Sequence, residues 1–319
     1  MTQDTSNSDS SYFLGFDGGG TKTECVLTDA SGCVLAKAFA GPSNPLRAGH
    51  MKAWFSLSEA ADCVLSRQKI RSSHIRGICA GLGGAGRAGV ARSVVTFFER
   101  GYPNAKVRVT TDIDIAFEAA FGSGEGIVLL AGTGSAAFGR DANGRSFRAG
   151  GRGPWFSDEG GAFDIGRRAL RAVALAEEHR GPATELSKRI FKRRETREWD
   201  SLIEQIAKNP EDVFPRLFPL VGELADVGDD VAREILARAA QSLAELAGCV
   251  AAGLGLRDRE LQVAKIGGAH GRSKYFDSSV EEALKKTMPH ARLVWPSISP
   301  GEAAARIASQ LSQLEGNAA

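Results

Sequence analysis

The sequence is poor in cysteine, in net charge and in long uninterrupted apolar runs. Its five cysteines, Cys25, Cys33, Cys63, Cys79 and Cys249, include no CxxC pair. A zinc site or a disulfide framework is therefore disfavoured, and a reducing, cytoplasmic compartment is expected. Two of these thiols lie within apolar runs, where a free cysteine behaves as a small core side chain.

Acids and bases nearly cancel along the chain. There are 40 Lys and Arg against 38 Asp and Glu, which leaves a net charge of +2. The one basic run, at 188–194, is interpreted as a solvated helix face, so nucleic acid is not expected as a partner. Charged residues interrupt the apolar runs, so we expect no stretch of transmembrane length and no membrane partner.

The first eleven residues differ in composition from the rest. Residues 1–11 are mainly Ser, Thr, Asn, Asp and Gln, without an apolar run. This composition predicts a disordered tail rather than a signal peptide. The rest of the 319 residues is longer than a chain that usually folds around a single hydrophobic core, which favours two domains.

Glycine, by contrast, is abundant, with 38 residues, and several glycine-rich turns follow apolar runs. The first turn, within Phe16–Thr23, reads FDGGGTKT and joins two strand-like segments. Glycines let backbone N–H groups approach an anion, and successive N–H groups form an anion-binding nest. Asp17, at the strand end, is then within reach of a phosphate-bound cation. An ordinary glycine turn is the alternative interpretation.

A second copy of this pattern begins after Gly126. Gly20-Thr21 and Gly132-Thr133 stand at the same offset before two similar turns, Asp29–Gly32 and Asp141–Gly144. This preserved spacing suggests an internal duplication, with two phosphate-binding loops facing each other across a cleft. Strands alternating with helices in the first copy predict a parallel extension of its sheet.

We therefore expect a first lobe at 12–121 and a second at 122–319, whose last helix is able to pack on the first lobe. Residues 183–255 are almost wholly helical by their apolar spacing and form an insertion in the second lobe. Asp112 lies where a predicted strand ends and a helix begins, which is the usual place for ligands in open α/β sheets.

These residues match a known family. The chain resembles the N-acetylglucosamine kinase group, within the BadF/BadG-type ATPases of the actin-like, sugar kinase and Hsp70 superfamily. Four motifs carry the resemblance, in the family's order: Phe16–Thr23, Ala131–Ser135, Gly150–Gly161 and Ile266–Gly271. The resemblance implies an α/β fold: a two-lobed actin-like ATPase, built from a duplicated ribonuclease H-like fold with a large helical insertion in the second lobe.

The resemblance also assigns roles to individual residues. Three loops are implied to bind ATP, through Gly18, Gly19, Gly20, Thr21, Lys22, Gly132, Thr133, Gly134, Gly267 and Gly268. Asp17 is implied to hold Mg²⁺, and Asp112 to act as the catalytic base. A further set is implied to hold the sugar, namely Asn44, Asp112, Ser135, Gly151 and Asp158, and Arg152 is expected to join it although the family has another residue there.

The implied activity is ATP-dependent phosphorylation of a hydroxyl, the 6-hydroxyl, of an amino sugar such as N-acetylglucosamine or glucosamine. A homodimer is expected. One alternative is an ATPase that activates a radical dehydratase or reductase, but such proteins need cysteines for an iron–sulfur cluster, and none lies between Cys79 and Cys249. A sugar sensor without catalysis is the other alternative.

Several of these residues have simpler interpretations. Asp112 is also placed to cap the following helix, and Asp158 to cap the helix beginning near Ala162. Asn44, between two prolines, also suits a turn, and Lys22 a solvated charge. Phosphoryl transfer depends mostly on positioning and charge neutralisation, which carboxylates and glycine loops supply.

One position departs from the family pattern. Arg152 stands where the family's GGWG motif has Trp, with Trp155 nearby as a substitute. A Trp packs on the apolar face or acetyl group of a sugar, whereas Arg offers charged donors. We therefore expect altered acceptor selection, toward glucosamine or a sugar with an anionic substituent.

Overall fold

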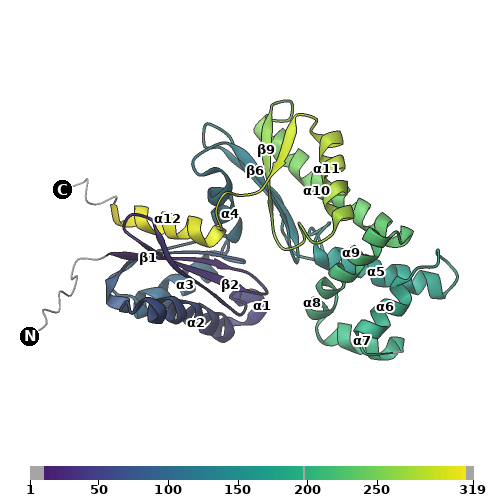
Figure 1. Cartoon of the computed structure of the whole chain (residues 1–319), viewed down its shortest axis with the longest axis horizontal. Coiled ribbons are helices and arrows are strands. Elements are labelled where there is room, and N and C mark those ends of the chain that lie inside the picture. The colour runs from purple at the N-terminus through teal and green to yellow at the C-terminus, as the bar shows by residue number, and fades with distance from the viewer. Residues whose placement is uncertain (1–10, 197, 314–319) are drawn as a thin grey trace, which may run out of the picture. The chain divides into compact units, whose positions relative to one another are not determined.

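The computed structural model describes residues 11–196 and 198–313. Apart from Ser11, the predicted disordered tail lies outside these residues. The chain forms two compact units (Figure 1). Unit 1 runs to Gly122 and resumes at Ser297, and unit 2 is the intervening segment.

Unit 1 is built on a five-stranded mixed sheet in the order β3-β2-β1-β4-β5. Its strands are β1 (Tyr12–Gly18), β2 (Thr23–Asp29), β3 (Val34–Ala40), β4 (Ile75–Leu82) and β5 (Lys106–Thr110). The first three strands are antiparallel, whereas β4 and β5 run parallel to β1. The central strands β1, β2 and β4 are buried along most of their length, because helices cover both faces of the sheet.

The helices of unit 1 divide between the two faces (Figure 1). One face packs on α2 (His50–Gln68) and α3 (Ala88–Gly101) through side chains such as Leu14 and Phe16. The other packs on α4 (Asp112–Phe121) and α12 (Pro300–Gln313) through Phe13 and Cys79. Two short helices, α1 (Pro45–Ala48) and η1 (Ser72–His74), flank α2.

Helix α12 lies against β1 and β4 because both strands carry glycine at the contact. A Cβ atom added at Gly15 would lie 2.1 Å from the backbone nitrogen of Ala305. One added at Gly77 would lie 2.3 Å from the carbonyl oxygen of Ala308. The chain's last helix therefore completes the core of unit 1.

Unit 2 repeats the topology of unit 1, with the order β8-β7-β6-β9-β10. Its strands are β6 (Gly126–Ala131), β7 (Ser135–Arg140), β8 (Ser146–Gly150), β9 (Leu261–Ile266) and β10 (Ala291–Val294). Again three strands are antiparallel and two run parallel to the first. The predicted duplication is confirmed, although β8 was not predicted, because its side chains are largely exposed and give no apolar pattern.

A set of helices separates β8 from β9, as predicted. They are α5 (Ala162–Glu177), α6 (Leu186–Arg193), α7 (Trp199–Lys208), α8 (Pro210–Val213), η2 (Pro215–Leu217), α9 (Phe218–Val227) and α10 (Asp230–Leu254), and α11 (Lys274–Thr287) follows β9. The statement that no apolar stretch approaches transmembrane length was wrong for α10, which is long and apolar enough by composition. Its apolar face instead packs into the core of unit 2.

Candidate functional site

The first glycine hairpin is held at the carboxyl ends of β1 and β4. The Gly19 amide donates to the carbonyl of Lys22 at 3.0 Å and closes the turn. The Gly19 carbonyl accepts from the amides of Ser43 and Asn44, both at 3.1 Å. The Gly83 amide donates to the carbonyl of Gly18 at 2.8 Å. The hairpin is therefore fixed by two other loops of the same sheet edge.

Adjacent glycines in this hairpin differ in what surrounds them. A Cβ atom at Gly18 would lie 2.1 Å from the Ser43 hydroxyl, so packing excludes a side chain there. One at Gly19 would meet only the Lys22 carbonyl, at 3.8 Å. Thr21 and Lys22 are exposed, and the Lys22 ammonium lies 5.4 Å from the centre of the Phe39 ring. The turn thus presents open backbone and a cation.

Asp17, the residue before the last of β1, lies directly opposite Glu24 on β2. Burial, then the charges of Asp112 and Glu24, raise the pKa of Asp17 from 3.8 to about 7, with Lys22 acting in the opposite direction. A carboxylate beside two like charges is relieved by a cation. The chemistry of this position therefore fits the predicted Mg²⁺ contact.

Asp112 is the first residue of α4, but it is not the helix cap. Thr111 is the N-cap, and its hydroxyl accepts from the Asp114 amide. The Asp114 carboxylate completes a capping box by accepting from the Thr111 amide at 3.1 Å. The capping interpretation of Asp112 is therefore wrong. Its Oδ1 accepts from the next amide, that of Ile113, at 3.0 Å.

Asn44 and Asp112 come together around one glycine. A Cβ atom at Gly83 would lie 2.9 Å from Asn44 Nδ2 and 3.4 Å from Asp112 Oδ2. Asn44 is also the N-cap of α1, where its Oδ1 accepts from the Leu46 amide at 3.0 Å, so the turn interpretation of this residue holds as well. The amide nitrogen and the carboxylate therefore remain directed to the same small space, which suits a hydroxylated ligand.

The second hairpin, between β6 and β7, is fixed by the start of α5. The Gly132 amide donates to the Gly134 carbonyl at 2.9 Å. The first amides of α5, at Ala162 and Phe163, donate to the carbonyls of Gly132 and Thr133 at 2.9 and 3.0 Å. A Cβ atom at Gly132 would meet no atom of the described residues within 4 Å, apart from its chain neighbours. This turn too combines a fixed backbone with open space.

Asp158 is turned into unit 2. Its side chain is buried, and its Oδ1 accepts from the Gly153 amide at 3.1 Å. A Cβ atom at Gly134 would lie 2.1 Å from its Oδ2. The N-cap of α5 is Gly161, so the capping interpretation of Asp158 is wrong. Ser135 is buried as well, and its hydroxyl donates to the Glu159 carbonyl at 2.6 Å.

The loop after β8 carries two exposed side chains, Arg152 and Trp155. Gly150, Gly151 and Gly153 have positive φ angles of 75°, 69° and 118°. Arg152 is exposed and makes no hydrogen bond or ion pair with the described residues. Trp155 is 63% exposed, and its ring meets Phe163 edge-on with centroids 5.4 Å apart. The loop therefore offers a cation and an aromatic ring to solvent.

The third predicted loop follows β9. Gly267 has a φ of 99°, and a Cβ atom there would lie 2.4 Å from the Ala131 carbonyl oxygen. The same oxygen accepts from the Ala269 amide at 3.0 Å, which ties this loop to the end of β6. In the part of the chain that the structure describes, a Cβ atom at Gly268 would meet no atom within 4 Å beyond its chain neighbours. In each of the three loops, one glycine is required by packing and another faces open space.

A match to a protein-family model over most of the chain establishes the family. The model of the BadF/BadG/BcrA/BcrD ATPase family matches residues 14–305, most of the chain. This chain belongs to that ATPase family. An N-acetylmuramic acid/N-acetylglucosamine kinase of Clostridium acetobutylicum is 29% identical over 89% of this chain and 93% of its own length. An N-acetyl-D-glucosamine kinase of Dictyostelium discoideum is 28% identical over 93% of this chain and 97% of its own.

A solved structure agrees with this family assignment. A candidate N-acetylglucosamine kinase from Chromobacterium violaceum superimposes with a TM-score of 0.76 at 26% identity, covering 93% of this chain and 98% of its own. The fold of this BadF/BadG-type ATPase is thus the two-lobed α/β actin-like fold that the sequence predicted.

Two residues at this sheet edge were not singled out from the sequence. Gly83 is one of them, and a Cβ atom built there would lie close to both Asn44 and Asp112. Glu24 was not considered, although its position opposite Asp17 follows from the hairpin register. Within the described residues, no group of three His, Cys, Asp or Glu side chains is arranged to hold a metal.

Proposed function

We propose that this chain is an ATP-dependent kinase that phosphorylates a hydroxyl of an amino sugar. The observation that carries the proposal is the meeting of Asp112 and Asn44 around Gly83, on the sheet edge that also carries Asp17 and the first glycine hairpin. Amino sugar kinases among the relatives support the choice of acceptor. The test is release of ADP from ATP and Mg²⁺ in the presence of N-acetylglucosamine.

In the proposed reaction, Asp112 is the general base. Its carboxylate takes the proton of the sugar hydroxyl as that oxygen bonds to the γ-phosphorus, and the bond from phosphorus to the β,γ-bridging oxygen breaks to release ADP. Asn44 orients the sugar by donating to one of its hydroxyls. The 6-hydroxyl is the proposed acceptor, and NMR of the product identifies the phosphorylated carbon.

The glycine loops are proposed to bind ATP. Gly18–Lys22 and Gly132–Gly134 supply backbone N–H groups to phosphate oxygens, and the open positions at Gly19 and Gly132 leave room for them. Gly267 and Gly268 form the proposed adenosine loop. Ser135, Gly151 and Asp158 complete the proposed sugar-binding set. The two buried side chains, Ser135 and Asp158, would act by shaping the loops that they join.

Asp17 is proposed to hold Mg²⁺, which when bound neutralises the charge of the phosphates. Its raised pKa means that the folded protein retains a proton that the unfolded chain loses near pH 3.8, so stability falls as pH rises from there to about 7. Asp17→Asn is therefore expected to stabilise the nucleotide-free protein by about 1–2 kcal/mol at pH 8 and less at pH 5, after discounting for partial exposure.

The same variant is expected to lose Mg²⁺-dependent ADP release at pH 8. Urea titrations at pH 5 and pH 8 measure the stability difference, and the coupled assay measures activity. Full activity of Asp17→Asn would remove this residue from the metal site. A stability difference that is equal at the two pH values would instead contradict the raised pKa.

Arg152 is proposed to select the acceptor. Its exposed guanidinium offers paired donors to an anionic substituent, and Trp155 offers a ring to the apolar face of a sugar. We expect Arg152→Met to raise KM at least tenfold for N-acetylmuramic acid, which carries a carboxylate, and less than threefold for N-acetylglucosamine, on the basis that a charge-assisted hydrogen bond is worth about 1.5–3 kcal/mol. Equal effects on both sugars would contradict the selective role.

A further inference from the structure

The loop between β3 and α2 is bound to the first glycine hairpin at several points. The Thr23 hydroxyl, at the start of β2, lies 2.7 Å from both the Gly41 carbonyl oxygen and the Ser43 hydroxyl oxygen. The amides of Ser43 and Asn44 donate to the Gly19 carbonyl, and Ser43 is completely buried. The short helix α1, which belongs to this loop, is therefore held at a fixed place beside the hairpin.

Helix α1 directs two polar side chains to two different glycine loops. Its N-cap, Asn44, lies beside Gly83, in the space that it shares with the proposed base. Arg47 lies beside Gly20 instead, because a Cβ atom built at Gly20 would be 3.1 Å from Arg47 Cδ and 3.2 Å from Arg47 Nη1. Less than one helical turn of sequence thus separates the side chain proposed to orient the acceptor from an arginine at the proposed phosphate loop.

Arg47 gives the hairpin a cation of a particular kind. Its side chain is half-buried, and its stem and guanidinium lie against Gly20, next to the open backbone at Gly19. Lys22 is also cationic, but it is exposed and lies toward the Phe39 ring. A guanidinium offers planar donors that match two oxygens of a phosphate at once, whereas an ammonium acts as a point charge. An apolar side chain would serve equally well if packing on Gly20 were the only role, so the charge indicates an anion.

A phosphate bound at this edge of the sheet needs such a cation. Asp17 and Glu24 lie directly opposite each other in the β1–β2 ladder, and Asp112 is close enough for its charge to act on Asp17. Carboxylates gathered in one place repel a polyphosphate, so its binding depends on compensating positive charge. The proposed Mg²⁺ supplies part of that charge, and the Arg47 guanidinium is placed to supply more.

We propose that Arg47 binds the γ-phosphoryl group of ATP and remains bound to it during transfer. The guanidinium donates hydrogen bonds to non-bridging oxygens of this group, first in ATP and then in the phosphorylated sugar. It stays protonated throughout, since Asp112 takes the proton of the acceptor hydroxyl and ADP keeps the bridging oxygen. This role rests on the proposed binding of ATP at Gly18–Lys22, and it is independent of which sugar is the acceptor.

The test compares nucleotides with and without the γ-phosphate. Isothermal titration calorimetry measures the Kd of ADP and of the β,γ-imido analogue of ATP, each with Mg²⁺ and without sugar. Arg47→Met keeps an unbranched stem over Gly20 and removes the guanidinium. We expect it to weaken binding of the ATP analogue at least tenfold, the usual effect of losing a charge-assisted hydrogen bond, and binding of ADP less than threefold. An unchanged Kd for the analogue, or equal weakening of both nucleotides, would overturn the proposal.

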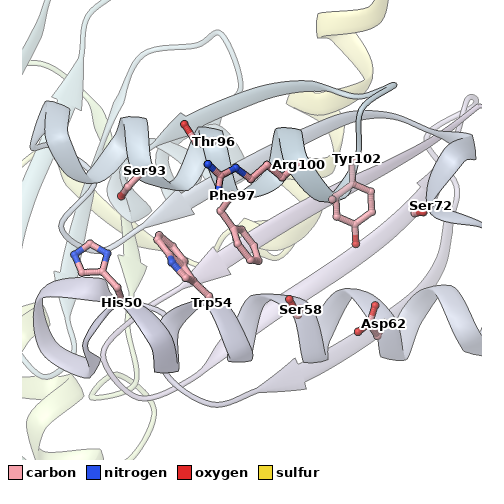
Figure 2. A pocket seen from close by; sticks show the side chains of 11 residues that line it. His50, Trp54, Ser58, Asp62, Ser72, Ser93, Thr96, Phe97, Arg100 and Tyr102 are labelled. Carbon is pink, nitrogen blue, oxygen red and sulfur yellow. The ribbon is translucent and has the colours of Figure 1, made fainter.

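Arg100 supplies the matched control. It is an exposed arginine in the last turn of α3, about 18 Å along the helix from its start. There it lines an open groove of about 780 Å³ between α2 and α3 (Figure 2). Arg100→Met is expected to change neither Kd. Arg47→Lys keeps the charge but loses the planar donors, so a smaller loss, again selective for the ATP analogue, is expected, and this variant decides the matter if Arg47→Met does not fold.

Turnover gives a second readout. Arg47→Met is expected to lower kcat with the amino sugar by about a hundredfold or more, as removal of one preorganised donor from a transition state does, while KM for the sugar changes less than threefold. A normal kcat would remove Arg47 from the transfer step. Absence of turnover in the wild type with every amino sugar would contradict the proposed function, and the comparison of nucleotides, which needs no acceptor, would still decide the role of Arg47.

Discussion

Replacing Asp112 with Asn is expected to lower kcat about a thousandfold, within the range of about 10²–10⁴ that a general base contributes. The Asn side chain keeps an oxygen that can accept from the Ile113 amide, as Asp112 does at 3.0 Å. It loses the ability to take a proton. ATP affinity and thermal stability should therefore change little, while sugar-dependent ADP release nearly disappears. Single-turnover kinetics, with ATP binding measured separately, would distinguish these effects.

Asp114, two residues later, supplies the matched control. Its carboxylate accepts from the hydroxyls of Thr110 and Thr111 and from the Thr111 amide, so it stabilises the start of α4. Asp114→Asn is expected to cost about 1 kcal/mol of stability, the usual effect of a lost cap, with kcat reduced less than threefold. If Asp112→Asn instead destabilised the protein and retained turnover, Asp112 would be a structural residue and the proposed mechanism would fail.

The contrast between these two acids shows what the sequence could and could not predict. The strand end at Asp112 was evident from the apolar run before it. The identity of the cap was not, because Thr111, Asp112 and Asp114 all suit the first turn of a helix. Only the hydrogen bonds of Asp114 decide between them.

Local patterns predicted the elements and the duplication, because glycine turns and apolar runs act over a few residues. Strand β8 was missed because its exposed side chains give no apolar alternation. The inward orientation of Asp158 was also missed, since it depends on Gly134, which is distant in sequence. The sequence analysis expected the last helix to be able to pack on the first lobe, but no local pattern reports the particular contact of α12 with Gly15, near the other end of the chain.

The open glycines provide a prediction that separates ligand binding from packing. Among the described residues, its two chain neighbours aside, none places an atom within 4 Å of a Cβ atom built at Gly132, whose φ is not in the left-handed region. Gly132→Ala should therefore leave thermal stability unchanged. If phosphate oxygens occupy the space beside Gly132, the added methyl group should raise KM for ATP at least tenfold, because a displaced charged hydrogen bond costs about 1.5–3 kcal/mol.

Gly134 in the same turn predicts the opposite pattern. A Cβ atom there would overlap Asp158 Oδ2 at 2.1 Å and its carboxyl carbon at 2.7 Å. Gly134→Ala should therefore destabilise unit 2 by about 1–3 kcal/mol, the usual cost of overpacking. Thermal unfolding and ATP titration of both variants measure the difference. If Gly132→Ala bound ATP normally, this turn would not contact the phosphates. The glycine would then be explained by the geometry of the hairpin alone.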